Sequence, residues 1–274
     1  MIQKIGGQQL AATRLVTLTT DFGSSDHFVG VMRGVILGVN PAAQIVDLCN
    51  AVNSFDVLDG ALTIGQAYSY FPVDTIHLVV VDPGVGTSRR PLLVRTDKHY
   101  FIAPDNGVLS LVMEKEERVL VRHITATHYF REPVSSTFHG RDIFAPCAGW
   151  LSKGVEPEKF GPEITDYVRF ALPKPKVISE RAIKGAVLKV DKFGNLVTNL
   201  TPENAPELFT AGARVKIRIG QNEVAAIRGT YAEGQAGELF AVLNSMGLLE
   251  IACNRGSAAH VAKAGRGADV LVEF

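Results

Sequence analysis

The sequence predicts a two-domain α/β protein. We expect a layered N-terminal α/β domain with a mainly parallel central sheet over residues 1–175, and a smaller C-terminal β-barrel domain over residues 176–274. Apolar runs alternate with helical patterns in the first part, the helical signal fades in the second, and a proline-rich stretch separates them. The length of 274 residues also exceeds the usual size of one domain.

The first domain is expected to alternate strands and helices from residue 15, after a short, partly flexible arm over residues 1–14. Strands are predicted over 15–20, 44–48, 76–81, 92–96, 99–103 and 119–124. Helices are predicted over 27–39, 54–70 and 141–151, with a shorter one that Asp105-Asn106-Gly107 opens and that ends near Glu114. Asp97-Lys98 lies between two of the strands and predicts a hairpin.

Two details of these helices carry further predictions. Gly30, Gly34 and Gly38 recur every four residues and therefore share one helix face. A glycine costs a helix about 1 kcal/mol relative to alanine, so we expect that face to pack closely, against the sheet. Ser54 is expected to cap the helix over 54–70, with Asp56 in its first turn.

The second domain is predicted from short strands and frequent glycine turns. Residues 157–175 contain four prolines and little periodicity, so we place the linker at the end of this stretch. Strands are predicted over 186–190, 196–199, 214–219, 223–227, 239–243, 248–252 and 270–273. Short strands at this spacing are typical of a small barrel or sandwich.

Composition excludes several classes of protein. Lysine plus arginine equals aspartate plus glutamate at 28 each, so no basic surface predicts nucleic-acid binding and no cationic helix predicts membrane binding. Cys49, Cys147 and Cys253 are odd in number and widely separated, which fits a reducing compartment and gives neither a disulfide framework nor a zinc pattern. No apolar stretch reaches transmembrane length, and the first residues lack the apolar middle of a signal peptide. We expect a cytoplasmic protein.

The most informative segment is IHLVVVDPGVGTSRR, residues 76–90. It predicts a buried parallel strand that delivers Asp82 to the carboxyl end of the sheet, where open α/β sheets place their ligand sites. A Pro-Gly-Val-Gly turn follows and allows Arg89 to fold back onto the carboxylate. Such a pair can orient a small polar reactant. A structural salt bridge beside a turn is the alternative interpretation.

Other polar residues lie at predicted loops. Asp21 and Asp26 lie in LTTDFGSSDHF, His139 lies in TFHGRD, and Asp191, Phe193 and Asn195 lie in DKFGNLVTN. Each alone is typical of a cap or turn. Together they predict a nucleoside-like ligand between the two domains, because carboxylates at strand ends bind ribose hydroxyls or an ammonium group.

Two alternatives concern the same positions. Asp21, Asp26, His27, Asp82 and His139 could converge on a metal, but no pair has a tight ligand spacing. Asp21-Phe22-Gly23 matches the kinase metal-binding tripeptide, but the glycine loop and lysine that should precede it are missing. Neither a metalloenzyme nor a kinase is therefore favoured.

Six motifs in order give the chain a specific resemblance. They are LTTDFGSSDHFVGVMRG, VVVDPGVGTSRR, APDNG, FHGRD, DKFGNLVTN and NSMGLLEIA. From about Leu15 onward the chain resembles the S-adenosylmethionine hydroxide adenosyltransferases, or S-adenosylmethionine hydrolases, which are relatives of the fluorinase and chlorinase enzymes. The resemblance implies hydrolysis of S-adenosylmethionine to adenosine and methionine, with no metal and no cofactor. It also implies a homotrimer whose sites lie at subunit interfaces.

The resemblance also implies a role for individual residues. The family's catalytic set falls on Asp82, Arg89 and His139. The substrate-binding positions fall on Asp21 for the ribose diol, Phe55 beside the ribose and reacting carbon, Asp26 and Asp191 for the methionine ammonium, Phe193 and Asn195 for adenine, and Ser245 for the methionine carboxylate.

Departures from the halogenating relatives bear on the nucleophile. At the positions of Asp82, Val85 and Gly140, those relatives carry tyrosine, threonine and serine. The hydroxyl groups of these residues help to hold a halide. A carboxylate repels halide and accepts a hydrogen bond from water, so water or hydroxide is the expected nucleophile. Phe28, Met246 and Cys253 also differ from the relatives, on the methionine side. A non-catalytic binder of adenosine or S-adenosylmethionine is the alternative function, and a residual halogenase is a third.

Overall fold

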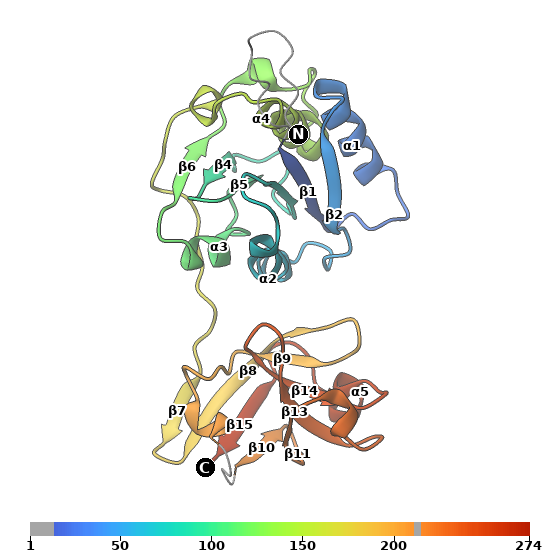
Figure 1. The fold of residues 1–274 in the computed structure, drawn as a ribbon, viewed down its shortest axis with the longest axis vertical. Coiled ribbons are helices and arrows are strands. Elements are labelled where there is room, and N and C mark those ends of the chain that lie inside the picture. Colours follow the sequence, from blue (N-terminus) through green and yellow to red (C-terminus); the bar gives the residue numbers. More distant parts are fainter. Residues whose placement is uncertain (1–13, 211–214) are drawn as a thin grey trace, which may run out of the picture. The chain divides into compact units, whose positions relative to one another are not determined.

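The computed structural model describes residues 14–210 and 215–274, which divide into two compact units (Figure 1). The first unit ends at Ala171 and the second begins at Leu172. Of the arm predicted over residues 1–14, residues 1–13 lie outside the described part of the chain.

The first unit is built on a six-stranded sheet with the order β2-β1-β3-β5-β4-β6. Its strands are β1 (Leu15–Thr20), β2 (Gln44–Cys49), β3 (Ile76–Val80), β4 (Pro91–Arg95), β5 (Tyr100–Pro104) and β6 (Leu120–His123). β2, β1, β3 and β5 run parallel, whereas β4 is antiparallel to both β5 and β6. The hairpin predicted around Asp97-Lys98 is confirmed as the β4–β5 pair.

Helices cover both faces of this sheet (Figure 1). They are α1 (Phe28–Val39), α2 (Val57–Ala67), α3 (Ser110–Lys115) and α4 (Ala145–Ser152), with a π-helical turn at Gly140–Phe144 before α4. Ile76 and Leu78 of β3 face a core shared with α1 and α4, whereas Val79 faces a core shared with α2 and α3. This two-sided burial explains why the β3 sequence is a nearly continuous apolar run.

The prediction that the glycine face of α1 packs against the sheet is wrong. Gly30, Gly34 and Gly38 are not packed against the sheet, because no atom outside the neighbouring residues and backbone of the helix lies within 4 Å of the place a Cβ would occupy on any of them. α1 buries Val29, Met32 and Ile36 instead, so the glycine repeat falls outside the buried face of the helix.

The predicted N-terminal cap of α2 is also wrong, because the cap is Asp56 rather than Ser54. The Asp56 side chain accepts a hydrogen bond from the Asp59 amide at 3.0 Å. Phe55 adopts a left-handed backbone conformation just before it, so the helix begins later than the sequence pattern indicates.

The second unit is a curled sheet with the order β11-β10-β15-β8-β9-β14-β13-β12, and β7 pairs with β8 (Figure 1). Its strands are β7 (Lys176–Ser179), β8 (Ala182–Val190), β9 (Leu196–Thr198), β10 (Lys216–Ile219), β11 (Asn222–Val224), β12 (Ile227–Arg228), β13 (Leu239–Leu243), β14 (Leu249–Cys253) and β15 (Asp269–Glu273). The expected barrel is confirmed only in part. The sheet curls as a half-barrel, and among the described strands its hydrogen-bonded order begins at β11 and ends at β12.

Differences from the predicted strands are local. β8 begins four residues earlier than predicted, and the strand predicted over 223–227 is two strands, β11 and β12, on opposite ends of the sheet. β7 and the short helix α5 (Ala258–Ala262) were not predicted, and the predicted start at Arg214 lies outside the described residues. No helix in the described part of the chain is long and apolar enough to cross a membrane.

Candidate active site

The polar residues of the first unit gather where its parallel strands end. Thr20 of β1 is in register with Val80 of β3, so the two strands end together. Asp21 directly follows β1, and Asp82 follows β3 after one further buried valine. The alternation of strand and helix therefore brings both carboxylates to one edge of the sheet.

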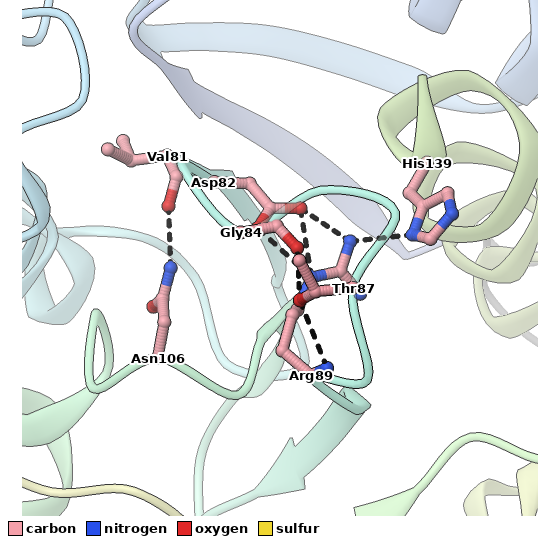
Figure 2. Close-up of polar contacts among 7 residues, drawn as sticks. All are labelled: Val81, Asp82, Gly84, Thr87, Arg89, Asn106 and His139. Atoms are coloured by element: carbon pink, nitrogen blue, oxygen red, sulfur yellow. Dashed lines mark hydrogen bonds and ion pairs between the residues drawn. The ribbon is translucent and has the colours of Figure 1, made fainter. Parts of the chain in front are cut away.

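Asp82 and Arg89 form a buried ion pair. The Arg89 Nε atom lies 3.0 Å from each oxygen of the Asp82 carboxylate, and Nη2 also donates to Oδ2. The Arg89 and Asp82 side chains are only 8% and 6% exposed. The intervening turn is held by the Thr87 hydroxyl, which donates to the Gly84 carbonyl at 2.7 Å (Figure 2). The sequence prediction that Arg89 folds back onto Asp82 is thus confirmed by the geometry.

His139 completes the cluster through Arg89. Its Nδ1 atom lies 2.7 Å from Arg89 Nη2 (Figure 2). A guanidinium is always a donor, so Nδ1 is the acceptor and the ring proton lies on Nε2. Burial lowers the pKa of His139, and the positive charge of Arg89 lowers it further. His139 is therefore a neutral imidazole that offers an N–H donor at Nε2.

One donor of Arg89 is left over. Nη1 is buried and has no hydrogen-bond partner among the residues that the structure describes. The guanidinium lies over the ring of Phe144, 5.1 Å from its centroid, so one of its faces is covered by an apolar group. A buried donor without a hydrogen-bond partner lowers the stability of the fold. The geometry thus provides a preorganised N–H group for a ligand or reacting oxygen.

A buried aspartate, which the sequence analysis did not single out, anchors the loop that carries His139. Asp142 is fully buried and accepts hydrogen bonds from the Ser135 amide at 2.9 Å and from Arg141 at 2.7 and 2.8 Å. Burial raises the pKa of the Asp142 carboxyl, but the hydrogen bonds from Arg141 and Ser135 outweigh it and hold the pKa below its usual value. Its signal in the sequence is its place in FHGRD, directly after Arg141.

A glycine allows the two loops of this cluster to meet. Gly86 has a φ of +78°, and a Cβ atom there would lie 2.1 Å from the Ser136 carbonyl oxygen. Only glycine therefore permits the turn between Asp82 and Arg89 to lie against the segment that leads to His139.

Asp21 and Phe55 are also brought together. The Phe55 amide donates to Asp21 Oδ2 at 2.8 Å and holds Phe55 at a φ of +64°, a conformation that nonglycine residues rarely adopt. Phe55 is 75% exposed. Asp26 lies on the exposed loop between β1 and α1. The backbone strain at Phe55 is consistent with a ring that is held out for a ligand.

In the second unit, Asp191, Phe193 and Asn195 share one tight turn. The Asp191 carboxylate accepts from the amides of Phe193 and Asn195, both at 2.8 Å, and from the Asn195 side chain at 3.1 Å. Phe193 is 77% exposed. These residues line an open pocket of about 530 Å³.

The same pocket contains residues that the sequence analysis missed. Tyr231, Asn254 and Arg255 line it together with Cys253 and Gly256. The only local signal is the Asn-Arg-Gly turn, in which Arg255 has a φ of +55°. Ser245 lies on the exposed turn between β13 and β14 and is not among the lining residues.

The metal alternative meets a chemical obstacle. The guanidinium of Arg89 already pairs with the Asp82 carboxylate and with Nδ1 of His139, and its positive charge disfavours a metal cation beside them. Within residues 14–210 and 215–274, no group of three or more histidine, cysteine or acidic side chains is arranged to hold a metal ion.

The fold and this cluster define an α/β protein with a carboxylate–guanidinium–imidazole site at the end of its parallel strands. Residues 16–161 match the SAM hydroxide adenosyltransferase N-terminal domain, and residues 185–271 match the C-terminal domain of the same family. The chain belongs to this family, and the resemblance seen in the sequence is confirmed.

Similar proteins support the same assignment. The chain is 33% identical to the (R)-S-adenosyl-L-methionine hydrolase of Salinispora tropica, over 91% of this chain and 94% of that protein. It is 26% identical to a fluorinase from an Actinoplanes species, over 88% and 91%. A crystal structure of an uncharacterized conserved protein from Thermotoga maritima superposes with a TM-score of 0.87 at 36% identity, covering 94% of this chain and all of that one.

Proposed function

We propose that the protein hydrolyses S-adenosyl-L-methionine to adenosine and L-methionine, by attack of water on the ribose 5′ carbon. The observation that carries the proposal is the buried cluster of Asp82, Arg89 and His139 at the carboxyl end of the parallel strands. It occurs in a chain whose family and relatives are named for this substrate.

The chemistry needs help at the nucleophile rather than at the leaving group. The substrate is a sulfonium, and breaking its C–S bond releases neutral methionine with the electron pair on sulfur. No acid is required for that step. Water is a weak nucleophile, so catalysis must orient it and stabilise its developing hydroxide character.

Each member of the cluster has a distinct part in this step. The unpaired Nη1 of Arg89 donates to the attacking oxygen, and the fixed positive charge stabilises it. Asp82 accepts the water proton through a lone pair that Arg89 leaves free. His139 donates from Nε2 to the same oxygen, because Arg89 already occupies its Nδ1 acceptor. The electron pair that is freed as the proton moves to Asp82 forms the new bond to carbon. The oxygen then lies in line with the C–S bond, about 3–3.5 Å from the carbon.

The same cluster disfavours halide. Asp82 presents a negative charge at the reacting end, which repels an anion but accepts a hydrogen bond from water. We therefore assign hydrolysis rather than halogenation, although fluorinases are among the relatives.

The substrate contacts are assigned from the family resemblance. The ribose diol hydrogen-bonds to Asp21 and packs near Phe55, and adenine contacts Phe193 and Asn195. The methionine ammonium pairs with Asp26 and Asp191, and its carboxylate binds Ser245. In support, Asp21 and Phe55 are joined by a hydrogen bond, and Asp191, Phe193 and Asn195 line one pocket.

These contacts require both domains, which we assign to residues 1–175 and 176–274, the second being the barrel of the family. The cluster around Asp82 belongs to the first compact unit and the pocket around Asp191 to the second. We propose a homotrimer in which each site joins the first domain of one subunit to the second domain of a neighbour. Size-exclusion chromatography with light scattering tests the trimer.

Product analysis tests the proposed function. Purified protein is incubated with S-adenosylmethionine, with and without high chloride, and the products are separated by chromatography. Equal amounts of adenosine and methionine, unchanged by chloride and lost in Asp82→Ala, are expected. A 5′-chloro product would assign a halogenase instead. Intact substrate that co-elutes with the protein would favour the non-catalytic binder.

A further inference from the structure

The second unit contains a buried carboxylate that the proposed chemistry does not use. Glu250 lies on β14 and is only 3% exposed. It pairs across the sheet with Val242 of β13, on the face that also carries the buried apolar residues Phe240 and Ala252. A carboxylate in such surroundings is costly unless hydrogen bonds compensate it, so its presence needs a reason.

Each oxygen of Glu250 accepts a hydrogen bond from a neutral donor. Oε1 accepts from the Tyr231 hydroxyl at 2.8 Å, and Oε2 accepts from the Asn244 side chain at 3.1 Å. Burial and the neighbouring Glu250 carboxylate raise the pKa of Tyr231 to about 12, so its hydroxyl remains a donor at physiological pH. Glu250 therefore joins two residues that lie on different segments of the chain.

Both partners belong to structures around the pocket. Tyr231 lines the pocket that also contains Asp191, Phe193 and Asn195. Asn244 begins the turn that carries Ser245, and its side-chain oxygen accepts from the amides of Met246 at 3.0 Å and Leu248 at 3.1 Å. One carboxylate thus holds a wall of the pocket and the conformation of this turn at the same time.

The segment that bears Tyr231 is fixed at a second point. The side chain of Asn254, another lining residue, donates to the Gly234 carbonyl at 2.7 Å. Gly234 itself packs directly against the ring of Phe240, with no room for a Cβ atom. Without the bond to Glu250, the Tyr231 end of this turn would lose its anchor while the Gly234 end kept its own.

We propose that Glu250 is a positioning residue for substrate binding, which ties the Tyr231 wall of the pocket to the turn that carries Ser245. This inference rests on the proposed function, because it takes the pocket as part of the S-adenosylmethionine site. Its effect acts through Tyr231 and Asn244, so it should appear in binding rather than in the chemical step.

Three substitutions separate this role from general stability. Glu250→Ala removes both acceptors. Glu250→Gln keeps the shape and can still bond both partners, since its amide oxygen accepts from Asn244 and its NH₂ group donates to the Tyr231 oxygen. Tyr231→Phe keeps the ring but removes the tie to Glu250. Glu223→Ala, on an exposed position of β11, is the matched control.

The readouts are KM and kcat with S-adenosylmethionine, and the affinity for adenosine by calorimetry. Glu250→Ala is expected to raise KM and weaken adenosine binding by about tenfold or more, with kcat within about threefold of wild type. Glu250→Gln should stay within about threefold in KM, Tyr231→Phe should weaken binding to a lesser degree, and Glu223→Ala should change nothing. Glu250→Ala should cost less affinity in the Tyr231→Phe background than in the wild type.

Wild-type KM in Glu250→Ala, a fall in kcat alone, or strictly additive effects of the two substitutions would overturn the proposal. If Glu250→Ala does not fold, Tyr231→Phe decides it, and unchanged adenosine affinity in that variant would overturn it. A wild-type protein that binds adenosine without consuming S-adenosylmethionine would refute the proposed function alone, since the calorimetric series still tests Glu250.

Discussion

Replacing Asp82 by asparagine removes one charge from a buried ion pair with almost no change in shape. Arg89 donates to both oxygens of Asp82, and both side chains are less than a tenth exposed. The asparagine side chain would still accept from Nε of Arg89, but its NH₂ group would face Nη2. Breaking a buried pair from one side costs about 3–5 kcal/mol, and the retained bond places the loss in the free energy of unfolding at about 3 kcal/mol.

Turnover should fall further than stability alone explains. Without the carboxylate, the attacking water loses its proton acceptor and Arg89 is no longer held by a bidentate contact. We expect kcat to fall by about 10²-fold or more in Asp82→Asn, with KM changed much less. The assays are urea unfolding for stability and chromatography of adenosine for turnover, both at pH 7.

The chain offers a matched control in the neighbouring pair. Asp166 accepts from Arg90 at 2.8 Å with the same chemistry, but its side chain is 77% exposed. Asp166→Asn should leave stability and turnover close to wild type, because exposed pairs contribute little. An Asp82→Asn variant as stable as Asp166→Asn would refute the contribution of the buried pair to stability. A kcat close to wild type in Asp82→Asn would refute the catalytic role of Asp82.

Other predictions concern binding, the turn after β3 and the response to pH. Asp21→Ala should weaken substrate binding, measured by calorimetry, far more than it lowers kcat; the reverse pattern would contradict the ribose assignment. Gly86→Ala should destabilise the fold by more than about 2 kcal/mol and abolish turnover, because its Cβ would meet the Ser136 carbonyl; Gly267→Ala, also left-handed but in open space, should lose only about 1 kcal/mol. Burial lowers the pKa of His77 to about 3 from 6.5, so the unfolded chain binds a proton that the folded one does not. The contribution of His77 to stability should therefore be complete above pH 6.5 and be lost by about 1.4 kcal/mol per pH unit below it, and a His77→Phe variant whose urea midpoints show the same slope as the wild type would contradict this.

Much of the first unit could be predicted because its signals are local. The β3 strand is buried on both faces, and the turn after it returns Arg89 to Asp82 within a few residues. The prediction from the glycine repeat of α1 was wrong, because a four-residue spacing shows that the glycines share a face but not that this face is the buried one. The buried face is set by Val29, Met32 and Ile36 instead.

The second unit was harder to predict, because its informative contacts are distant in sequence. Glu250 bonds to Tyr231 and lies opposite Val242, and no spacing pattern connects these residues before the sheet is formed. β11 and β12 are separated by two residues and lie at opposite ends of the sheet, which strand propensity cannot reveal. The short helix α5, with five residues capped by Ser257, is below the length at which helical periodicity is visible.

The most direct test of water attack at the 5′ carbon is hydrolysis in ¹⁸O-labelled water, followed by mass spectrometry of the products. Water attack at that carbon forms the new C–O bond in adenosine. The account therefore predicts one ¹⁸O atom in the adenosine 5′-hydroxyl and none in methionine. Unlabelled adenosine, or label carried by the amino-acid product, would contradict it.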